Sequence, residues 1–204
     1  MQLMTTSDTT SDTVLLAALR GGDAAAFQAL YRRHQGPLFR YALMRCASRD
    51  IAADVIQEVF MGLLTGSLHF DPLRGALAGF LYGVTRKLIL RHEQARFPQL
   101  ALVGEDLPDD DDAYGDDDAA CPRQEPLARL LSDELAEQVR RAITLLPPHY
   151  RDPVILYELH ELSYLDIAAI CQIDIGTVRS RLSRGRAALA KRLASLRPTA
   201  LNEA

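Results

Sequence analysis

A strongly acidic segment, residues 98–126, divides this 204-residue chain into two parts. The segment contains ten acidic residues, one arginine, four prolines and two glycines. Because like charges repel and proline blocks regular structure, we expect a solvated, flexible linker here. The chain should therefore fold as two small domains, residues 1–97 and 127–204, on either side of this linker.

The charge of the chain is distributed very unevenly, although the net charge is only −4. The linker carries −9, whereas residues 175–198 carry seven arginines and lysines and no acidic residue. One interpretation is a solvated helix with a basic face, but its positive charges would then repel one another without compensation. The interpretation that we favour is a helix that contacts nucleic acid.

Apolar residues on both sides of the linker recur at helical spacing, and no stretch shows the sustained alternation that is typical of strands. We therefore predict an all-α fold. The expected helices cover roughly residues 23–47, 50–66, 75–96, 128–146 and a further stretch that ends near residue 162. In that last stretch we place Pro153 in the first turn with Asp152 as the cap, because a later proline costs a hydrogen bond.

The stretch from residue 163 onward predicts a helix-turn-helix. Ser163 and Asp166 have the spacing of a capping box at the start of a short helix, residues 164–171. Asp174 can then cap a second, basic helix that runs from residue 175 to about residue 196. In this motif the N-terminal residues of the second helix enter the major groove of DNA.

Nothing in the sequence indicates catalysis or a cofactor. Three cysteines and five histidines lie scattered without metal-ligand spacing, so we expect no metal site. The chain shows no glycine-rich phosphate loop and no nucleophile elbow, and we expect no enzyme activity. It also lacks a signal peptide and an apolar run of membrane-spanning length, so we expect a cytoplasmic protein without membrane insertion.

Several motifs in this order resemble the extracytoplasmic-function group of bacterial sigma factors. FQALYRRHQGPLFRYAL and ADVIQEVFMGLL resemble the first helices of sigma region 2, and FDPLRGALAGFLYGVTRKLI resembles the part that melts and reads the −10 element. SYLDIA followed by GTVRSRLSRGRAAL resembles region 4, which reads the −35 element. The resemblance implies a subunit that binds core RNA polymerase, recognises promoter DNA and starts transcription.

The resemblance also implies roles for individual residues. The positions that match polymerase contacts, on the clamp helices of the largest subunit, are Asp54, Gln57 and Glu58. The positions that match −35 contacts are Thr177, Arg179, Ser180, Arg181, Ser183 and Arg184, with Thr177 and Arg181 expected on phosphates. The positions that we assign to the −10 element are Arg74, Phe80, Arg86 and Lys87.

Two of the −10 positions depart from the family pattern. Phe80 stands where many relatives have tryptophan, and Lys87 stands where they have asparagine. Phenylalanine can still stack, but lysine replaces an amide that reads bases with a charge suited to phosphates. Partners that the resemblance implies are core RNA polymerase, including its flap region, promoter DNA and an anti-sigma factor.

Two alternatives remain open at this point. The first is a helix-turn-helix regulator with a helical N-terminal sensor domain, since such regulators share the C-terminal motif. The second concerns the linker, which is either a soluble spacer or a mimic of nucleic acid that folds back on the basic helix or occupies the RNA path of the polymerase. Promoter elements about 17 base pairs apart lie roughly 58 Å from each other, within the extended reach of the linker at about 95–100 Å.

Overall fold

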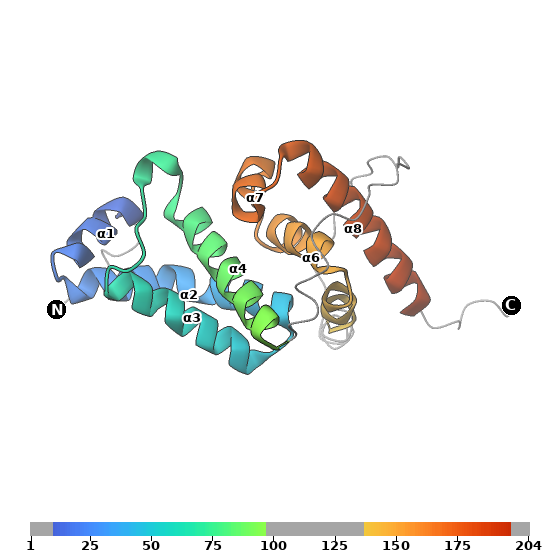
Figure 1. The fold of residues 1–204 in the computed structure, drawn as a ribbon, viewed down its shortest axis with the longest axis horizontal. Coiled ribbons are helices and arrows are strands. Elements are labelled where there is room, and N and C mark those ends of the chain that lie inside the picture. Colours follow the sequence, from blue (N-terminus) through green and yellow to red (C-terminus); the bar gives the residue numbers. More distant parts are fainter. Residues whose placement is uncertain (1–9, 97–136, 197–204) are drawn as a thin grey trace, which may run out of the picture.

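The computed structural model describes residues 10–96 and 137–196, and every regular element in these two ranges is helical (Figure 1). The expected all-α fold is confirmed. The N-terminal range forms α1 (Asp12–Arg20), α2 (Ala24–Cys46), α3 (Arg49–Leu64), the 3-10 turn η1 (Pro72–Arg74) and α4 (Leu77–Arg96). The C-terminal range contains a helical stretch at 137–144, then α6 (Pro148–Val154), the π-helical turn η3 (Ile155–Leu159), α7 (Tyr164–Cys171) and α8 (Ile175–Leu196). The acidic segment 98–126 lies outside the described residues.

Helix α3 shows how the apolar pattern of the sequence becomes the core of the N-terminal part. Its six stripe residues, Ala52, Val55, Ile56, Val59, Phe60 and Leu63, are all buried. The helix packs against both α2 and α4. A stripe of this kind leaves the opposite face to solvent, and that face carries the three carboxylate and amide side chains expected to touch polymerase.

Helix α1 was not predicted from the sequence. Ser11 caps it by accepting a hydrogen bond from the backbone N–H of Val14. Leu15, Leu16 and Leu19 of this helix are buried, and α1 packs along α2. At nine residues the helix is too short for its periodicity to stand out, and its stability comes from this packing.

The predicted placement of Pro153 was wrong. Helix α6 begins at Pro148, whose missing N–H costs nothing at the first helical position, and Pro147 precedes it as the cap residue. Pro153 lies inside the helix, and the chain continues directly into the π-helical turn η3. Asp152 is therefore no cap: it is an interior residue of α6, and its side chain is buried.

The two described ranges pack against each other. Helix α4 contacts α7, and α2 contacts both α6 and η3 (Figure 1). The helix that matches the −10-reading part thus lies beside the first helix of the helix-turn-helix. The sequence offered no prediction of this contact, because it joins elements on opposite sides of the acidic segment.

Candidate nucleic-acid interface

The helix-turn-helix forms with the boundaries expected from its capping residues. Ser163 Oγ accepts from the backbone N–H of Asp166 at 3.2 Å, at the start of α7. Gln172 ends α7 in the left-handed conformation, with φ +58°. Asp174 then accepts from the backbone N–H of Thr177 at 2.8 Å, at the start of α8. These local contacts fix where the basic helix begins and hence which of its residues come first.

The inner face of α8 holds it against the rest of the C-terminal part. Val178 and Leu182 are fully buried, and they pack with Ile167 of α7 in one core. One turn further, a Cβ on Gly185 would lie 2.6 Å from Val154 Cγ2, so α6 and α8 cross where only hydrogen fits. This packing sets which side of α8 faces solvent.

The outer face of α8 presents the residues expected at the −35 element. Arg179 and Ser183 are exposed, one turn apart on the same side of the helix. Ser180, Arg181 and Arg184 are half-buried. Arginine can pair with guanine through two hydrogen bonds, so this side of the helix can read base edges in the major groove.

Thr177 differs from the other residues of this set. Its hydroxyl donates to Asp174 Oδ2 at 2.6 Å, and its backbone N–H donates to the other oxygen of the same carboxylate. The hydroxyl hydrogen bond and the N–H together lower the pKa of Asp174. A phosphate at this end of the helix would therefore compete with Asp174 for the donors of Thr177.

Three of the four −10 candidates lie where nucleic acid can reach them. Arg74 and Lys87 are exposed, at η1 and in the middle of α4 respectively. Phe80 is half-buried, and its ring centroid lies 5.5 Å from that of Phe70. An aromatic pair of this kind fixes the ring of Phe80 while leaving part of it accessible for stacking.

Arg86, the fourth −10 candidate, is not on the surface of this structure. Only 9% of the residue is exposed, and its Nε lies 2.8 Å from Asp152 Oδ2 on α6. Burial opposes its charge, but the carboxylate of Asp152 and smaller effects of Cys171 and Tyr41 favour it, and the pKa of Arg86 is raised. Contact between Arg86 and DNA therefore requires this ion pair to open.

Asp152 also joins α6 to α2. Tyr41 donates its hydroxyl hydrogen to Asp152 Oδ1 at 3.1 Å, and Arg45 Nε lies 2.7 Å from the same oxygen, an ion pair outside hydrogen-bond geometry. Arg45 makes two further hydrogen bonds to the carboxylate of Glu93. Sequence reasoning missed this cluster, and its one signal was an aspartate that directly precedes the apolar run 153–156.

The polar face of α3 is exposed as expected. Asp54, Gln57 and Glu58 all lie on the solvent side, opposite the buried stripe. Glu58 is paired with Arg91 of α4 at 2.6 Å. Carboxylates on a rigid helix face suit a basic or hydrogen-bond-donating partner surface.

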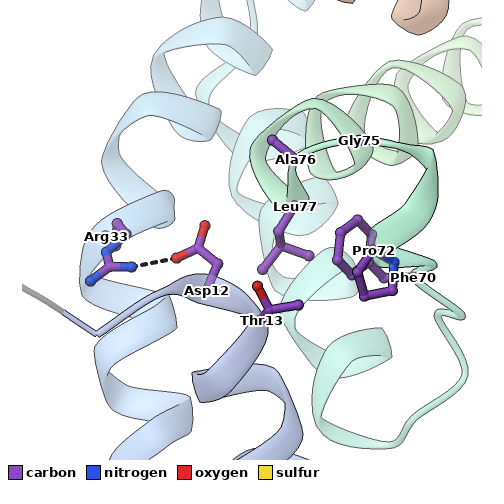
Figure 2. Close-up of a pocket in the computed structure, with 8 residues that line it drawn as sticks. All are labelled: Asp12, Thr13, Arg33, Phe70, Pro72, Gly75, Ala76 and Leu77. Atoms are coloured by element: carbon purple, nitrogen blue, oxygen red, sulfur yellow. Dashed lines mark hydrogen bonds and ion pairs between the residues drawn. The ribbon is translucent and has the colours of Figure 1, made fainter.

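A pocket of about 330 Å³ lies where α1, α2 and the segment leading into α4 meet (Figure 2). Arg33 points toward Asp12 across its edge, 2.5 Å away (Figure 2), and His34 Nε2 lies 2.9 Å from the same carboxylate. Burial lowers the pKa of His34 despite Asp12. The other residues that line the pocket are Thr13, Phe70, Pro72, Gly75, Ala76 and Leu77. The charged groups of the pocket are already paired with each other, so they do not indicate an ionic ligand.

The described residues show no group of three or more potential metal ligands. Across 10–96 and 137–196, no helix is both long and apolar enough to cross a membrane. The exposed functional groups of these two ranges are those of a binding surface: arginines, serines and carboxylates on helix faces.

These two helical parts correspond to two regions of one protein class. Residues 30–96 match the family described as Sigma-70 region 2, and residues 136–189 match the family described as Sigma-70, region 4. The first match covers the described polymerase and −10 candidates, and the second covers every −35 candidate. The chain has both of these helical regions of sigma-70 factors.

Comparison with individual relatives assigns the chain to one group within this class. The ECF RNA polymerase sigma-E factor of Haemophilus influenzae is 33% identical over 86% of this chain and 92% of its own length. The ECF RNA polymerase sigma factor SigE of Mycolicibacterium smegmatis is 31% identical over 85% of this chain, which spans 65% of that relative. The chain therefore belongs to the extracytoplasmic-function (ECF) group of RNA polymerase sigma factors. The alternative of a regulator with a sensor domain is not favoured, because the N-terminal part is sigma region 2.

A solved structure shares the fold. CnrH, in complex with the cytosolic domain of CnrY, superposes with a TM-score of 0.63 at 22% identity. The match covers 91% of this chain and 99% of that one. The similarity thus extends over both helical parts.

Proposed function

We propose that this chain is a promoter-recognition subunit that brings core RNA polymerase to its promoters and has no catalytic activity of its own. In this proposal residues 1–97 bind the core enzyme and the −10 element, residues 127–204 bind the −35 element, and residues 98–126 connect them. The protein would act where bacterial RNA polymerase acts, in the cytoplasm.

The observation that carries this proposal is the outer face of α8. A carboxylate cap fixes the start of the helix, a buried face fixes its rotation, and Arg179 and Ser183 are exposed on the side that remains. Since helix-turn-helix proteins read bases with the first turns of the second helix, these residues are suited to base contacts in the −35 element. Ser180 and Arg184 are the further residues assigned to bases, and Thr177 and Arg181 are assigned to phosphates.

The exposed groups of α3 and α4 support the other two roles. Asp54, Gln57 and Glu58 offer a compact polar surface for the clamp helices of the largest polymerase subunit. Arg74 and Lys87 supply positive charge near Phe80, a combination suited to single-stranded DNA, in which charges hold phosphates and rings stack on bases. Arg86 joins this group once its ion pair opens.

An anti-sigma factor is the expected regulatory partner. CnrH is described in complex with the cytosolic domain of CnrY, and the Bartonella quintana sigma factor RpoE is described in complex with the anti-sigma factor NepR. The flap region of the polymerase is the further contact expected for the C-terminal part. We propose both partners for this chain by analogy with its family.

Transcription reconstituted in vitro tests the proposal. The purified chain is mixed with bacterial core RNA polymerase and genomic DNA fragments, and the transcripts are sequenced. We expect a limited set of start sites that core enzyme alone does not use, with shared sequences upstream. Failure of the chain to migrate with core enzyme, together with an unchanged transcript set, would contradict the proposal.

A further inference from the structure

The carboxylate of Asp152 is bound by side chains of the other part of the chain. Its partners are Tyr41 and Arg45 on α2 and Arg86 on α4, whereas Asp152 itself belongs to α6. Asp152 is only 2% exposed and Arg45 only 1%. We call these four residues the latch. It exists only when the N-terminal and C-terminal parts are in contact.

The charges of the latch depend on one another. Burial alone would lower the pKa of Arg45, but Asp152 and Glu93 more than compensate and raise it. A buried charge is tolerated when its partners are in place and is strongly unfavourable when one partner is removed. Removing the charge of Asp152 would leave Arg45 and Arg86 close together with only Glu93 to balance them, which favours separation of the two parts.

Two further contacts close the same interface. Arg151, beside Asp152, donates from Nη1 to the backbone oxygen of Arg45 at 2.7 Å. The hydroxyl of Tyr82 on α4 lies 2.8 Å from Nδ1 of His160, just after η3. These two contacts join the same two parts of the chain outside the latch, so the interface extends over α2, α4, α6 and the end of η3.

The closed arrangement affects the proposed functional surfaces differently. It buries Arg86 and lays α7 against α4, the helix assigned to the −10 element. It leaves Asp54, Gln57 and Glu58 on α3 exposed. It also keeps α4 and α8 in one body, whereas promoter elements roughly 58 Å apart require them to separate.

We propose that the latch is an autoinhibitory contact, in which Asp152 occupies Arg86 in place of a nucleic-acid phosphate. The closed factor remains able to dock on core polymerase through α3, but it cannot engage the −10 strand through Arg86 until α6 leaves α4. The inference rests on the proposed function, because it takes α4 as a nucleic-acid-binding helix.

The test compares the full chain with Asp152→Asn, which keeps the shape of the side chain and removes its charge. The matched control is Glu137→Gln, which also removes one negative charge from the C-terminal part, at an exposed site paired within its own helix with Arg140 and Arg141. Small-angle X-ray scattering reports whether the two parts separate. Fluorescence anisotropy with a labelled 20-nucleotide single-stranded DNA of mixed sequence reports whether α4 becomes available.

We expect Asp152→Asn to increase the radius of gyration and Glu137→Gln to leave it unchanged. The variant should bind the DNA at least about fivefold more tightly than the control, the gain expected when fewer than about one molecule in five is open at rest. An unchanged radius of gyration in Asp152→Asn would show that the latch does not hold the two parts together. A larger radius without tighter DNA binding overturns autoinhibition.

Tyr82→Phe covers the case in which Asp152→Asn loses helicity by circular dichroism. This variant removes one hydroxyl from the interface and should open the chain in the same direction, by less. A Tyr82→Phe protein that matches the parent in both measurements then overturns the inference. Reconstituted transcription separates this result from failure of the proposed function. If the parent chain starts transcription but the variants gain neither size nor DNA affinity, only the latch is refuted. If the parent chain does not start transcription, the proposed function is refuted.

Discussion

Arg91 Nη2 lies 2.6 Å from Glu58 Oε2, so a carboxylate assigned to polymerase binding is already paired with an arginine of α4. Both side chains are about half exposed, 61% for Arg91 and 46% for Glu58. Exposed pairs of this kind contribute about 0–1 kcal/mol, so a partner protein can replace Arg91 at little cost. The pair positions Glu58 before binding without preventing it.

The double variant Asp54→Ala and Glu58→Ala should lose core polymerase while keeping its fold. Both side chains are exposed and lie opposite the buried stripe of α3, so the thermal melting point should change little. Capture of core enzyme by the immobilised chain measures binding. Arg91→Ala is the control, because it breaks the same ion pair but keeps the carboxylate; it should bind nearly normally. Equal binding by the double variant and the parent would refute the assignment.

Arg179→Ala should weaken binding to the −35 element by about 1–3 kcal/mol, the usual cost of losing a two-bonded arginine–guanine contact. The comparison uses a duplex selected for tight binding and a scrambled duplex of the same composition. Loss only on the selected duplex indicates base reading. Equal loss on both would show that Arg179 contacts phosphates alone.

Arg184→Ala tests the next turn of the same helix. Arg184 is half-buried, so its side chain is more constrained than that of Arg179. We expect a loss of about 1–3 kcal/mol on the selected duplex here too. A salt series separates the two kinds of contact, because a phosphate contact reduces the slope of log affinity against log salt by about one.

Local signals in the sequence were sufficient for most elements of the fold. Ser163 and Asp174 mark the starts of α7 and α8 because a cap acts within three residues of its position. Pro153 was misplaced because burial of the ring in the core offsets the lost hydrogen bond, and burial is a property of the tertiary structure. Arg86 was placed on the surface for the same reason: its partner is 66 residues away in the sequence.

The contact between the two parts should weaken at acidic pH because of His160. Burial, with a smaller effect from Arg40, lowers the pKa of His160 to about 4. One ring nitrogen meets the hydroxyl of Tyr82, and the other is buried without a hydrogen-bond partner. The ring also lies against Tyr41, so α2 and α4 both face it. Among the described residues, the groups that face the ring are Tyr82, Tyr41 and Arg40, and none of these is a carboxylate that could compensate a positive charge.

The direction of this pH effect follows from proton binding by His160. When the parts separate, the pKa of His160 returns to its ordinary value of 6.5, so the open chain binds a proton more readily than the closed one. The contact is therefore at full strength above about pH 6.5 and weakens as the pH falls toward 4. Small-angle scattering at pH 7.5 and 5.5 measures this opening. His160→Phe keeps the ring contacts and should reduce the difference; an identical difference in parent and variant contradicts the prediction.

Gly185→Ala should destabilise the C-terminal part by about 1–3 kcal/mol, the range for overpacked cores. The new Cβ would lie 2.6 Å from Val154 Cγ2 and 3.4 Å from Tyr150 Cβ. Gly83→Ala is the matched control, since that glycine also lies inside a helix but a Cβ there meets nothing within 4 Å. Replacing a glycine in an open helical position stabilises by roughly 0.4–1 kcal/mol. Urea unfolding should shift the two variants in opposite directions.

The crossing of α6 and α8 also has a mechanical consequence. Gly185 lies near the middle of α8, with about 15 Å of helix on either side of it. In the neighbouring position, Arg186 Nε lies 2.6 Å from Glu158 Oε1, and the guanidinium group lies over the ring of Tyr157. The middle of the helix is therefore fixed to η3 as well as to α6. Val178 and Leu182 also bury the N-terminal half of α8 in the core, whereas the last turns of the helix are largely exposed. We therefore expect a partner that pulls on the C-terminal end of α8 to load α6 and η3 while the DNA-reading end keeps its place.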